Sequence, residues 1–209
     1  MRRIWYLLCQ TVLQIFFIPV FRLRVYGREN VPQTGGTVIA SNHQSFFDPV
    51  LVGVGLPRSL TYMARDSLFR FPPFRWLIRS LNAIPFHREG VDTTTIREAI
   101  QRVSAGGALV IFPEGTRTRD GSISKIKKGT GLISRNAMAP VVPAVIDGAF
   151  EAWPRHSVLC RPHPIRVAFG PPISCADQAA MSAEEMAQAI SDRMAALQRF
   201  LFEKRDLKR

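Results

Sequence analysis

Short apolar runs alternate with longer segments of helical periodicity along most of this chain. Apolar runs rich in β-branched residues predict buried strands, whereas apolar residues three or four positions apart predict amphipathic helices. Strands are expected at residues 23–27, 37–40, 60–64, 82–86, 108–112, 141–146 and 165–169, and helices at 48–54, 92–104, 130–138 and from 182 onward. This alternation predicts an α/β fold with a largely parallel sheet flanked by helices.

Several polar side chains follow directly after predicted strands. His43 comes after one strand, Arg88 after another, and the segment 114–117 after a third. In open α/β sheets ligands bind beyond the carboxyl ends of the strands, which lie along one edge. We therefore expect these residues to converge on a single rim of the sheet.

A histidine and an aspartate lie five positions apart in the segment 39–49. A neutral imidazole accepts a proton only at a bare ring nitrogen, and a carboxylate bonded to the other nitrogen fixes that tautomer. His43 and Asp48 are therefore candidates for a general base and the group that orients it. Because no serine or cysteine in this segment lies in a G-x-S-x-G turn, the nucleophile is expected to be a substrate hydroxyl.

The same two residues also have a purely structural interpretation. Asp48 followed by Pro49 is typical of a helix start, with aspartate as the N-cap and proline at the first helical position. His43 would then be a loop residue bonded to a backbone carbonyl. Since a spacing of five does not align side chains on one helix face, a pairing of the two requires a strand-to-helix corner.

A short turn that contains glycine and two charged residues follows the fifth predicted strand. Gly115 permits close backbone approach or a positive φ, and the guanidinium of Arg117 suits a phosphate. Arg88 and Lys128 are candidates for further phosphate ligands, although each cation taken alone is also explained as solvated surface charge. Glu114 either accepts a hydrogen bond from a substrate hydroxyl, holds Arg117 or caps a helix.

Residues 4–21 contain no charged side chain, and arginines flank them on both sides. Their number lies near the lower limit for crossing a bilayer, roughly 17–25 residues. The flanking charges and bulky aromatic residues favour a monotopic or re-entrant anchor, and a full span or an ordinary buried helix is the alternative. No small-residue cleavage site of a signal peptide follows. We expect a membrane anchor at residues 1–24 and one domain at 25–209.

Mixed arginine and aromatic residues at 65–79 suit a lipid headgroup layer or a solvated helix face.

The chain is strongly basic, with 28 Lys+Arg against 16 Asp+Glu and a formal net charge of +12. Such a surplus predicts an anionic partner, which is a nucleic acid, an acidic membrane face or a phosphorylated substrate. The cysteines at 9, 160 and 175 are widely scattered and form neither a disulfide framework nor a C-x-x-C metal motif. A reducing compartment is therefore expected.

Taken together, four blocks resemble the glycerolipid acyltransferase family, in particular its 1-acyl-glycerol-3-phosphate acyltransferases. The blocks are Asn42-His43-x4-Asp48, Ile84-Pro-Phe-His-Arg88, Phe112-Pro-Glu-Gly-Thr-Arg117 and Val141-Val-Pro-Ala-Val145. They occur in the family's order over roughly residues 25–150, and Lys128-Gly129 is similar to the family's lysine-glycine step. The C-terminal third adds little to the resemblance.

This resemblance implies an acyltransferase domain at 25–209 in which His43 deprotonates the free hydroxyl of lysophosphatidic acid and Asp48 orients the imidazole. The hydroxyl oxygen attacks an acyl thioester from acyl-CoA or acyl carrier protein, with no acyl-enzyme and no further cofactor, and phosphatidic acid results. The implied phosphate ligands are Arg88, Arg117 and Lys128, and the implied glycerol site is shaped by Glu114, Gly115 and Thr116. The expected location is an anionic membrane surface on the cytoplasmic face of the inner membrane.

Two other classes of protein remain open from the sequence. A nucleic-acid binder explains the charge but not the uncharged N-terminal segment, and we expect no nucleic-acid partner. A non-catalytic lipid-binding protein of the same fold would bind vesicles without releasing thiol from acyl-CoA. Within the enzyme class, glycerol 3-phosphate or another lysolipid is an alternative acceptor.

Overall fold

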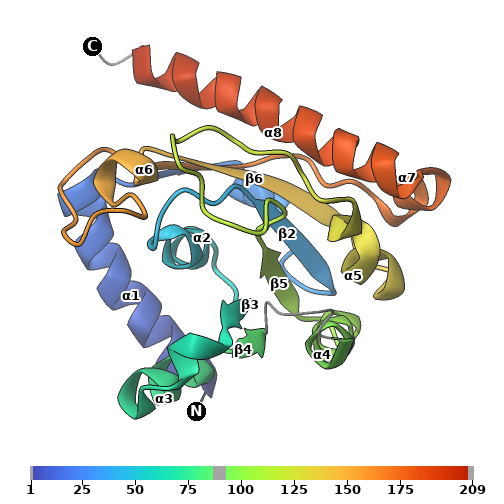
Figure 1. The fold of residues 1–209 in the computed structure, drawn as a ribbon, viewed down its shortest axis with the longest axis horizontal. Helices are drawn as coiled ribbons and strands as arrows, with labels where there is room; N and C mark the ends of the chain where they lie inside the picture. The colour runs from blue at the N-terminus through green and yellow to red at the C-terminus, as the bar shows by residue number, and fades with distance from the viewer. Residues whose placement is uncertain (1, 87–92, 207–209) are drawn as a thin grey trace.

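A seven-stranded sheet forms the centre of the protein in a computed structural model that describes residues 2–86 and 93–206 (Figure 1). Its strand order is β1-β7-β6-β2-β5-β3-β4, and every neighbouring pair is parallel except β6 and β7. The strands are β1 (Arg24–Tyr26), β2 (Thr37–Ser41), β3 (Leu60–Arg65), β4 (Ala83–Phe86), β5 (Ala108–Ile111), β6 (Val141–Asp147) and β7 (Arg166–Phe169). The predicted α/β fold with a largely parallel sheet is confirmed.

Helices of very different length connect and cover these strands. The described α-helices are α1 (Arg2–Phe21), α2 (Asp48–Gly55), α3 (Pro72–Ser80), α4 (Thr93–Ser104), α5 (Gly131–Asn136), α6 (Ala149–Ala152), α7 (Cys175–Ala180) and α8 (Ala183–Asp206). Short 3-10 turns occur at Arg28–Asn30, Asp66–Phe69 and Lys128–Thr130. The sequence did not predict α6 and α7, which have four and six residues.

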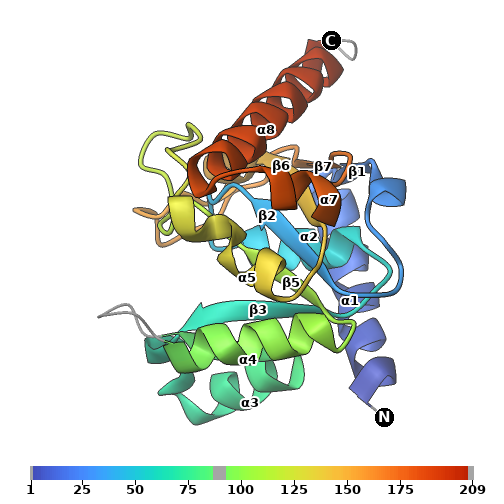
Figure 2. The same cartoon turned by 90° about the vertical axis from the view of Figure 1, so that its right-hand side faces the viewer.

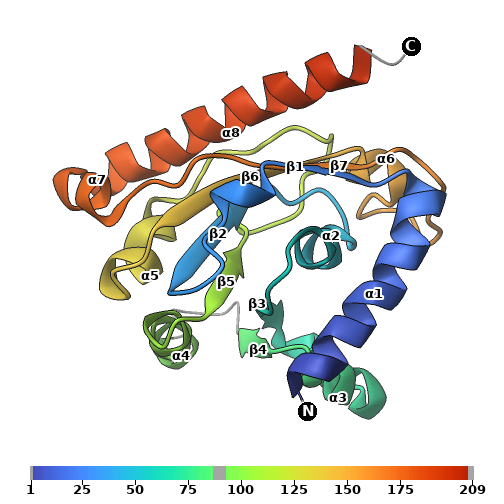
Figure 3. The ribbon, with the colours of Figure 1, turned by 180° about the vertical axis from the view of Figure 1, so that it is seen from behind.

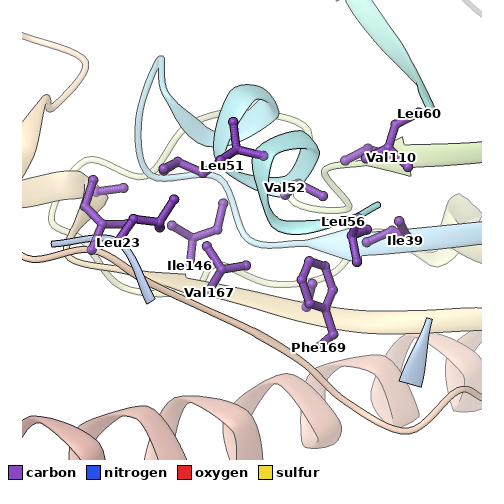
Figure 4. Close-up of a cluster of buried hydrophobic side chains, with 14 of the residues drawn as sticks. Leu23, Ile39, Leu51, Val52, Leu56, Leu60, Val110, Ile146, Val167 and Phe169 are labelled. Atoms are coloured by element: carbon purple, nitrogen blue, oxygen red, sulfur yellow. The ribbon is translucent and has the colours of Figure 1, made fainter. Parts of the chain in front are cut away.

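Each face of the sheet packs against its own group of helices, as Figure 2 shows in side view. Because side chains alternate along a strand, Ile39 of β2 points to one face while Val38 and Ala40 point to the other. The first face carries α1, α2 and α6, and its buried cluster is drawn in Figure 4. The second face carries α4, α5 and α8. Met186, Ile190 and other apolar residues of α8 are fully buried there.

The N-terminal helix α1 presents glutamine, not apolar side chains alone, to the rest of the protein. Gln10 donates from Nε2 to the backbone oxygen of Gly53 at 2.7 Å and also to that of Leu56, and Gln14 donates to Val54 at 3.1 Å. These bonds add side-chain donors to carbonyl groups in and just after the last turn of α2, of which Gly53 O also accepts from Leu56 N. The glutamine face of α1 is therefore its inner face.

Apolar side chains cover the opposite face of α1, which runs along one flank of the molecule (Figure 3). Ile4 is 73% exposed and Ile15 is 69% exposed. Leu7, Leu8, Val12, Phe16, Ile18 and Val20 are exposed as well. Among the described residues, α1 alone is long and apolar enough to cross a membrane, over Ile4–Phe21. One apolar helix of this kind suggests membrane association.

Replacement of Gln10 by leucine tests the inner face of α1. The leucine has a similar volume but leaves the Gly53 and Leu56 carbonyls without this donor, so the free energy of unfolding should fall by about 1–3 kcal/mol. Chemical denaturation in detergent measures the change. Gln188→Leu on the exposed surface of α8 is the control, and equal stability of the two variants would contradict the inferred packing.

Candidate active site

The parallel sheet brings the two principal motif segments together. Residue 43 follows β2 and residue 114 follows β5, and these strands pair in parallel with Ala40 opposite Ile111. The backbone nitrogen of His43 donates to Glu114 Oε1 at 2.7 Å, and Thr118 N donates to the His43 oxygen at 2.8 Å. The expected convergence of these segments at one rim is thus present in the structure.

The imidazole of His43 is bonded to the carboxylate of Asp48. The distance between His43 Nδ1 and Asp48 Oδ2 is 2.7 Å. When the imidazole is neutral and the carboxylate ionised, this geometry assigns the proton to Nδ1, because the carboxylate only accepts hydrogen bonds, and Nε2 is then bare. The His43 side chain is 19% exposed, whereas that of Asp48 is fully buried. The pair therefore offers a base that solutes can reach, oriented by an acid that they cannot.

Backbone amides hold the Asp48 carboxylate in place. Oδ2 also accepts from Gln44 N at 2.6 Å and from Ser45 N at 2.7 Å. Burial raises the pKa of the Asp48 carboxyl, while the hydrogen bonds from His43, Ser45 and Gln44 act against this rise. The structure corrects the expected capping role, because α2 begins at Asp48 with Phe47 as its N-cap, and no side-chain cap bond forms. The carboxylate instead binds the turn that precedes the helix.

Two neighbouring residues hold the His43 ring and the segment that carries it. The Phe112 ring stacks on the imidazole with centroids 4.1 Å apart and an angle of 19°. Asn42 binds the edge of β6 through its side chain, donating to Ile146 O at 2.9 Å and accepting from Ile146 N at 2.7 Å. Both residues stood inside the recognised motif blocks, but their separate roles follow only from the three-dimensional contacts.

Glu114 is buried and acts on backbone groups. Its Oε1 accepts from His43 N, and its Oε2 accepts from Ser124 N at 2.8 Å. Burial raises the pKa of the Glu114 carboxyl, and the amide hydrogen bonds oppose that rise. Both carboxylate oxygens of Glu114 thus bind backbone amides, a contact that the sequence did not predict. The Glu114 side chain joins the turn at His43 to the loop at Ser124 and so helps to hold the backbone of His43 in position.

The glycine turn carries one arginine and comes close to a lysine. Gly115 has a φ of 73°, in the left-handed region that glycine adopts readily, and Thr116 beside it is exposed. A Cβ at residue 115 would overlap with the side chain of Lys127. The guanidinium of Arg117 lies 3.6 Å from the centre of the Phe46 ring. Arg117 and Lys127 are thus the described cations of this turn.

The structure does not gather all the predicted phosphate ligands. Lys128 is exposed and forms an ion pair with Glu184 at the start of α8, while its neighbour Lys127 lies over Gly115. The sequence showed three lysines at 125–128 and gave no means of choosing the one that faces the turn. Arg88 lies outside the described residues.

An aromatic cluster that the sequence did not reveal joins α1 to the histidine corner. Phe47, which immediately precedes Asp48, contacts the rings of Phe17 and Phe21 of α1 with centroids 5.1 and 5.2 Å apart. Its other neighbour is Trp153, at 4.8 Å. The apolar N-terminal helix therefore packs directly against the segment that holds His43 and Asp48.

This arrangement supports proton transfer near a group that carries negative charge. The bare Nε2 of His43 can take a proton from a hydroxyl, and Asp48 stabilises the imidazolium that forms. The nearby cations Arg117 and Lys127 suit a phosphate or another anion.

Comparison with known proteins gives three results. The model of the family described as Acyltransferase matches residues 22–147. A 1-acyl-sn-glycerol-3-phosphate acyltransferase of Bacillus subtilis (strain 168) is 29% identical over 188 residues, which cover 90% of this chain and 92% of that protein. A Pseudomonas aeruginosa protein of the same name is 31% identical over 153 residues, which cover 72% of this chain but only 58% of that protein.

The fold has a counterpart among solved structures. The crystal structure of the 1-acyl-sn-glycerophosphate (LPA) acyltransferase PlsC from Thermotoga maritima is similar with a TM-score of 0.76 and 22% identity. The match covers 96% of this chain and 98% of that chain. At this identity, the likeness shows that the two chains share a fold.

Replacement of Glu114 by glutamine tests the support behind the site. An amide has only one acceptor oxygen, so either His43 N or Ser124 N loses its partner, and the free energy of unfolding should fall by about 1–3 kcal/mol. Hydrogen exchange should accelerate at one of these two amides, the one that loses its acceptor. Glu29→Gln, at an exposed position, is the control, and unchanged exchange in Glu114→Gln would contradict the assigned contacts.

Proposed function

Because this chain belongs to the acyltransferase family, we propose that it transfers a fatty acyl group to the free hydroxyl of 1-acyl-glycerol 3-phosphate. The product is phosphatidic acid, a precursor in phospholipid synthesis. The donor is an acyl thioester of coenzyme A or of acyl carrier protein. The observation that carries this proposal is the 2.7 Å bond between His43 and the fully buried Asp48, and the names of the bacterial relatives support the substrate class.

In the proposed reaction, His43 Nε2 takes the proton of the acceptor hydroxyl as its oxygen attacks the thioester carbonyl. The tetrahedral intermediate then collapses, the carbon–sulfur bond breaks, and the imidazolium returns the proton to the departing thiolate. Asp48 orients the ring in both steps and stabilises its charged form. No covalent acyl-enzyme is formed, because the nucleophile belongs to the acceptor.

We propose that the glycine turn binds the phosphate of the acceptor. Arg117 offers a planar fork for phosphate oxygens, and the side chain of Lys127 adds a point charge over Gly115. Arg88 remains a proposed ligand from the resemblance. Thr116 is a candidate for the glycerol site because it is exposed beside the turn, whereas the buried Glu114 supports the site through backbone amides.

Residues 1–24 are proposed to be the membrane anchor of an acyltransferase domain at 25–209. The inner face of α1 is bonded to α2 through Gln10 and Gln14, and its outer face is apolar. Crossing a bilayer would bring that polar inner face and its contacts into hydrocarbon, which is unfavourable. These contacts favour an anchor that lies in one leaflet with its outer face in the lipid.

Helix α3 extends the proposed membrane surface. The Trp5 ring of α1 lies 5.8 Å from that of Trp76, and Trp5 Nε1 donates to Ser80 Oγ at 2.9 Å. Phe71 is 66% exposed and Trp76 is 64% exposed. Exposed arginines at 70, 75 and 79 lie among these aromatic residues. Such a mixture suits an anionic headgroup layer.

The three free cysteines favour the cytoplasmic face of the membrane, where thiols stay reduced.

Replacement of His43 by alanine tests the proposed base. Thiol release from acyl-CoA in the presence of 1-acyl-glycerol 3-phosphate should fall by about 10²–10⁴-fold, the usual contribution of a general base, while circular dichroism stays unchanged. His156→Ala, an exposed histidine, serves as control. Glycerol 3-phosphate and other lysolipids, assayed in parallel, identify the acceptor. Near-normal transfer by a folded His43→Ala protein would reject the proposed role.

Replacement of Arg117 by lysine tests the proposed phosphate contact. Lysine keeps the charge but loses the planar fork and its stacking on Phe46, so the KM for the lysolipid acceptor should rise about tenfold with a smaller change in kcat. The matched control is Arg119→Lys, an exposed neighbour in the same loop. Equal effects of the two substitutions, measured by acceptor titration at saturating acyl-CoA, would exclude a specific role for Arg117.

A further inference from the structure

The loop between α6 and β7 exposes two neighbouring apolar side chains at its tip. Val158 is 90% exposed and Leu159 is 80% exposed, and Cys160 beside them is exposed as well. A single exposed apolar residue is ordinary. Two adjacent ones at a loop tip, with almost their whole surface in water, need a covering partner to become favourable.

Hydrogen bonds within the loop hold this tip outward. Trp153 Nε1 donates to Ser157 O at 3.1 Å, and Ser157 Oγ donates to Leu159 O at 2.7 Å. On the returning side, Arg161 N donates to Ala152 O at 2.9 Å. These bonds close the base of the loop, and they satisfy its polar groups without folding the apolar tip back onto the domain.

The charged residues within the loop are all basic. Exposed Arg155 and Arg161 flank it, and no acidic residue occurs between residues 152 and 165. Apolar side chains between two arginines are complementary to an anionic membrane surface, where hydrocarbon lies below a layer of negative headgroups.

The loop is anchored beside both α1 and the candidate active site. The Trp153 ring contacts those of Phe46 and Phe47, and Arg155 Nη1 donates to Arg117 O at 3.4 Å. At the other end, Ile165 N donates to Phe21 O at the last residue of α1, at 2.8 Å. Figures 1 and 3 show the loop next to that end of α1.

We propose that residues 155–161 form a second membrane contact, which inserts Val158 and Leu159 into an anionic bilayer. This inference rests on the proposed membrane association through α1. With α1 on one side and this loop on the other, the turn at Arg117 lies next to the lipid surface. A lysolipid then reaches His43 from the bilayer with its phosphate still at headgroup level and without passing through water.

A fluorescent probe on Cys160 measures insertion directly. In a Cys9→Ala, Cys175→Ser background, an environment-sensitive dye on Cys160 should brighten and shift to shorter wavelength when vesicles of phosphatidylcholine and phosphatidylglycerol are added. Nitroxide-labelled lipids should quench it. The control carries Cys9→Ala and Cys160→Ser with the dye on the exposed Cys175 of α7, at the far end of the molecule from the loop (Figure 1). That dye should respond to neither treatment.

A paired variant separates this contact from the anchor. Val158→Ser with Leu159→Ser should weaken partitioning into the same vesicles about tenfold, whereas thiol release in detergent micelles should be unchanged. Met138→Ser removes another highly exposed apolar side chain and should leave partitioning unaltered. On vesicles of phosphatidylcholine alone, where the arginines lack anionic partners, the Val158→Ser, Leu159→Ser variant should lose less of its partitioning.

The possible results distinguish the two proposals. If the protein sediments with vesicles but the dye on Cys160 stays unshifted, α1 alone is the anchor and the loop proposal is wrong. Failure of the protein to bind vesicles would contradict the membrane proposal and the loop proposal together. A dye response to an acidic carrier protein instead of lipid would assign the loop to a protein partner and also overturn it.

Discussion

One buried carboxylate oxygen determines the shape of the candidate site. Asp48 Oδ2 accepts hydrogen bonds from a ring nitrogen and two backbone amides within 2.6–2.7 Å, and a buried charge of this kind is costly unless hydrogen bonds compensate for the lost water. The chain between residues 43 and 48 must therefore curl around this oxygen. That curl aims the His43 ring at the rim of the sheet, so the local electrostatic requirement and the proposed chemistry are satisfied by the same bonds.

The surroundings supply what this short turn cannot supply alone. Phe112 supports the ring from one side, and Glu114 binds the His43 amide and connects it to the loop at Ser124. Phe47 is held by aromatic rings of α1. As a result, the helix proposed to lie in the membrane also packs against the segment that holds His43 and Asp48. The proposed lipid-facing element and the proposed base thus share one packed interface, as a membrane-borne acceptor would require.

Much of this organisation could be predicted from the sequence, because it depends on local patterns. Strand and helix positions followed from hydrophobic periodicity, and the pairing of His43 with Asp48 followed from a strand-to-helix corner. The start of the C-terminal helix near residue 182 was also predicted, and Ser182 and Glu185 form reciprocal capping bonds there. These features need only neighbours in the chain.

Other features depend on contacts between distant segments and could not be predicted from the sequence. The sequence offered a substrate hydroxyl, Arg117 or a helix cap as partners of Glu114, whereas its backbone partners at 43 and 124 become adjacent only after the loops fold. The choice between Lys127 and Lys128 depends on the path of the loop over Gly115. Gln10 and Gln14 lie four positions apart in the N-terminal segment, but only their bonds to carbonyls of α2 show that this face of α1 points inward.

The most direct test concerns the tautomer of His43. The chain contains four histidines, so two-bond proton–nitrogen correlation spectra of ¹⁵N-histidine-labelled protein in detergent are simple, and His43→Ala assigns the signal. At a pH where the imidazole is neutral, the account predicts the Nδ1–H form for residue 43 and its loss in Asp48→Asn. A predominant Nε2–H form in the wild-type protein would leave no bare nitrogen for the acceptor hydroxyl and would contradict the proposed catalysis.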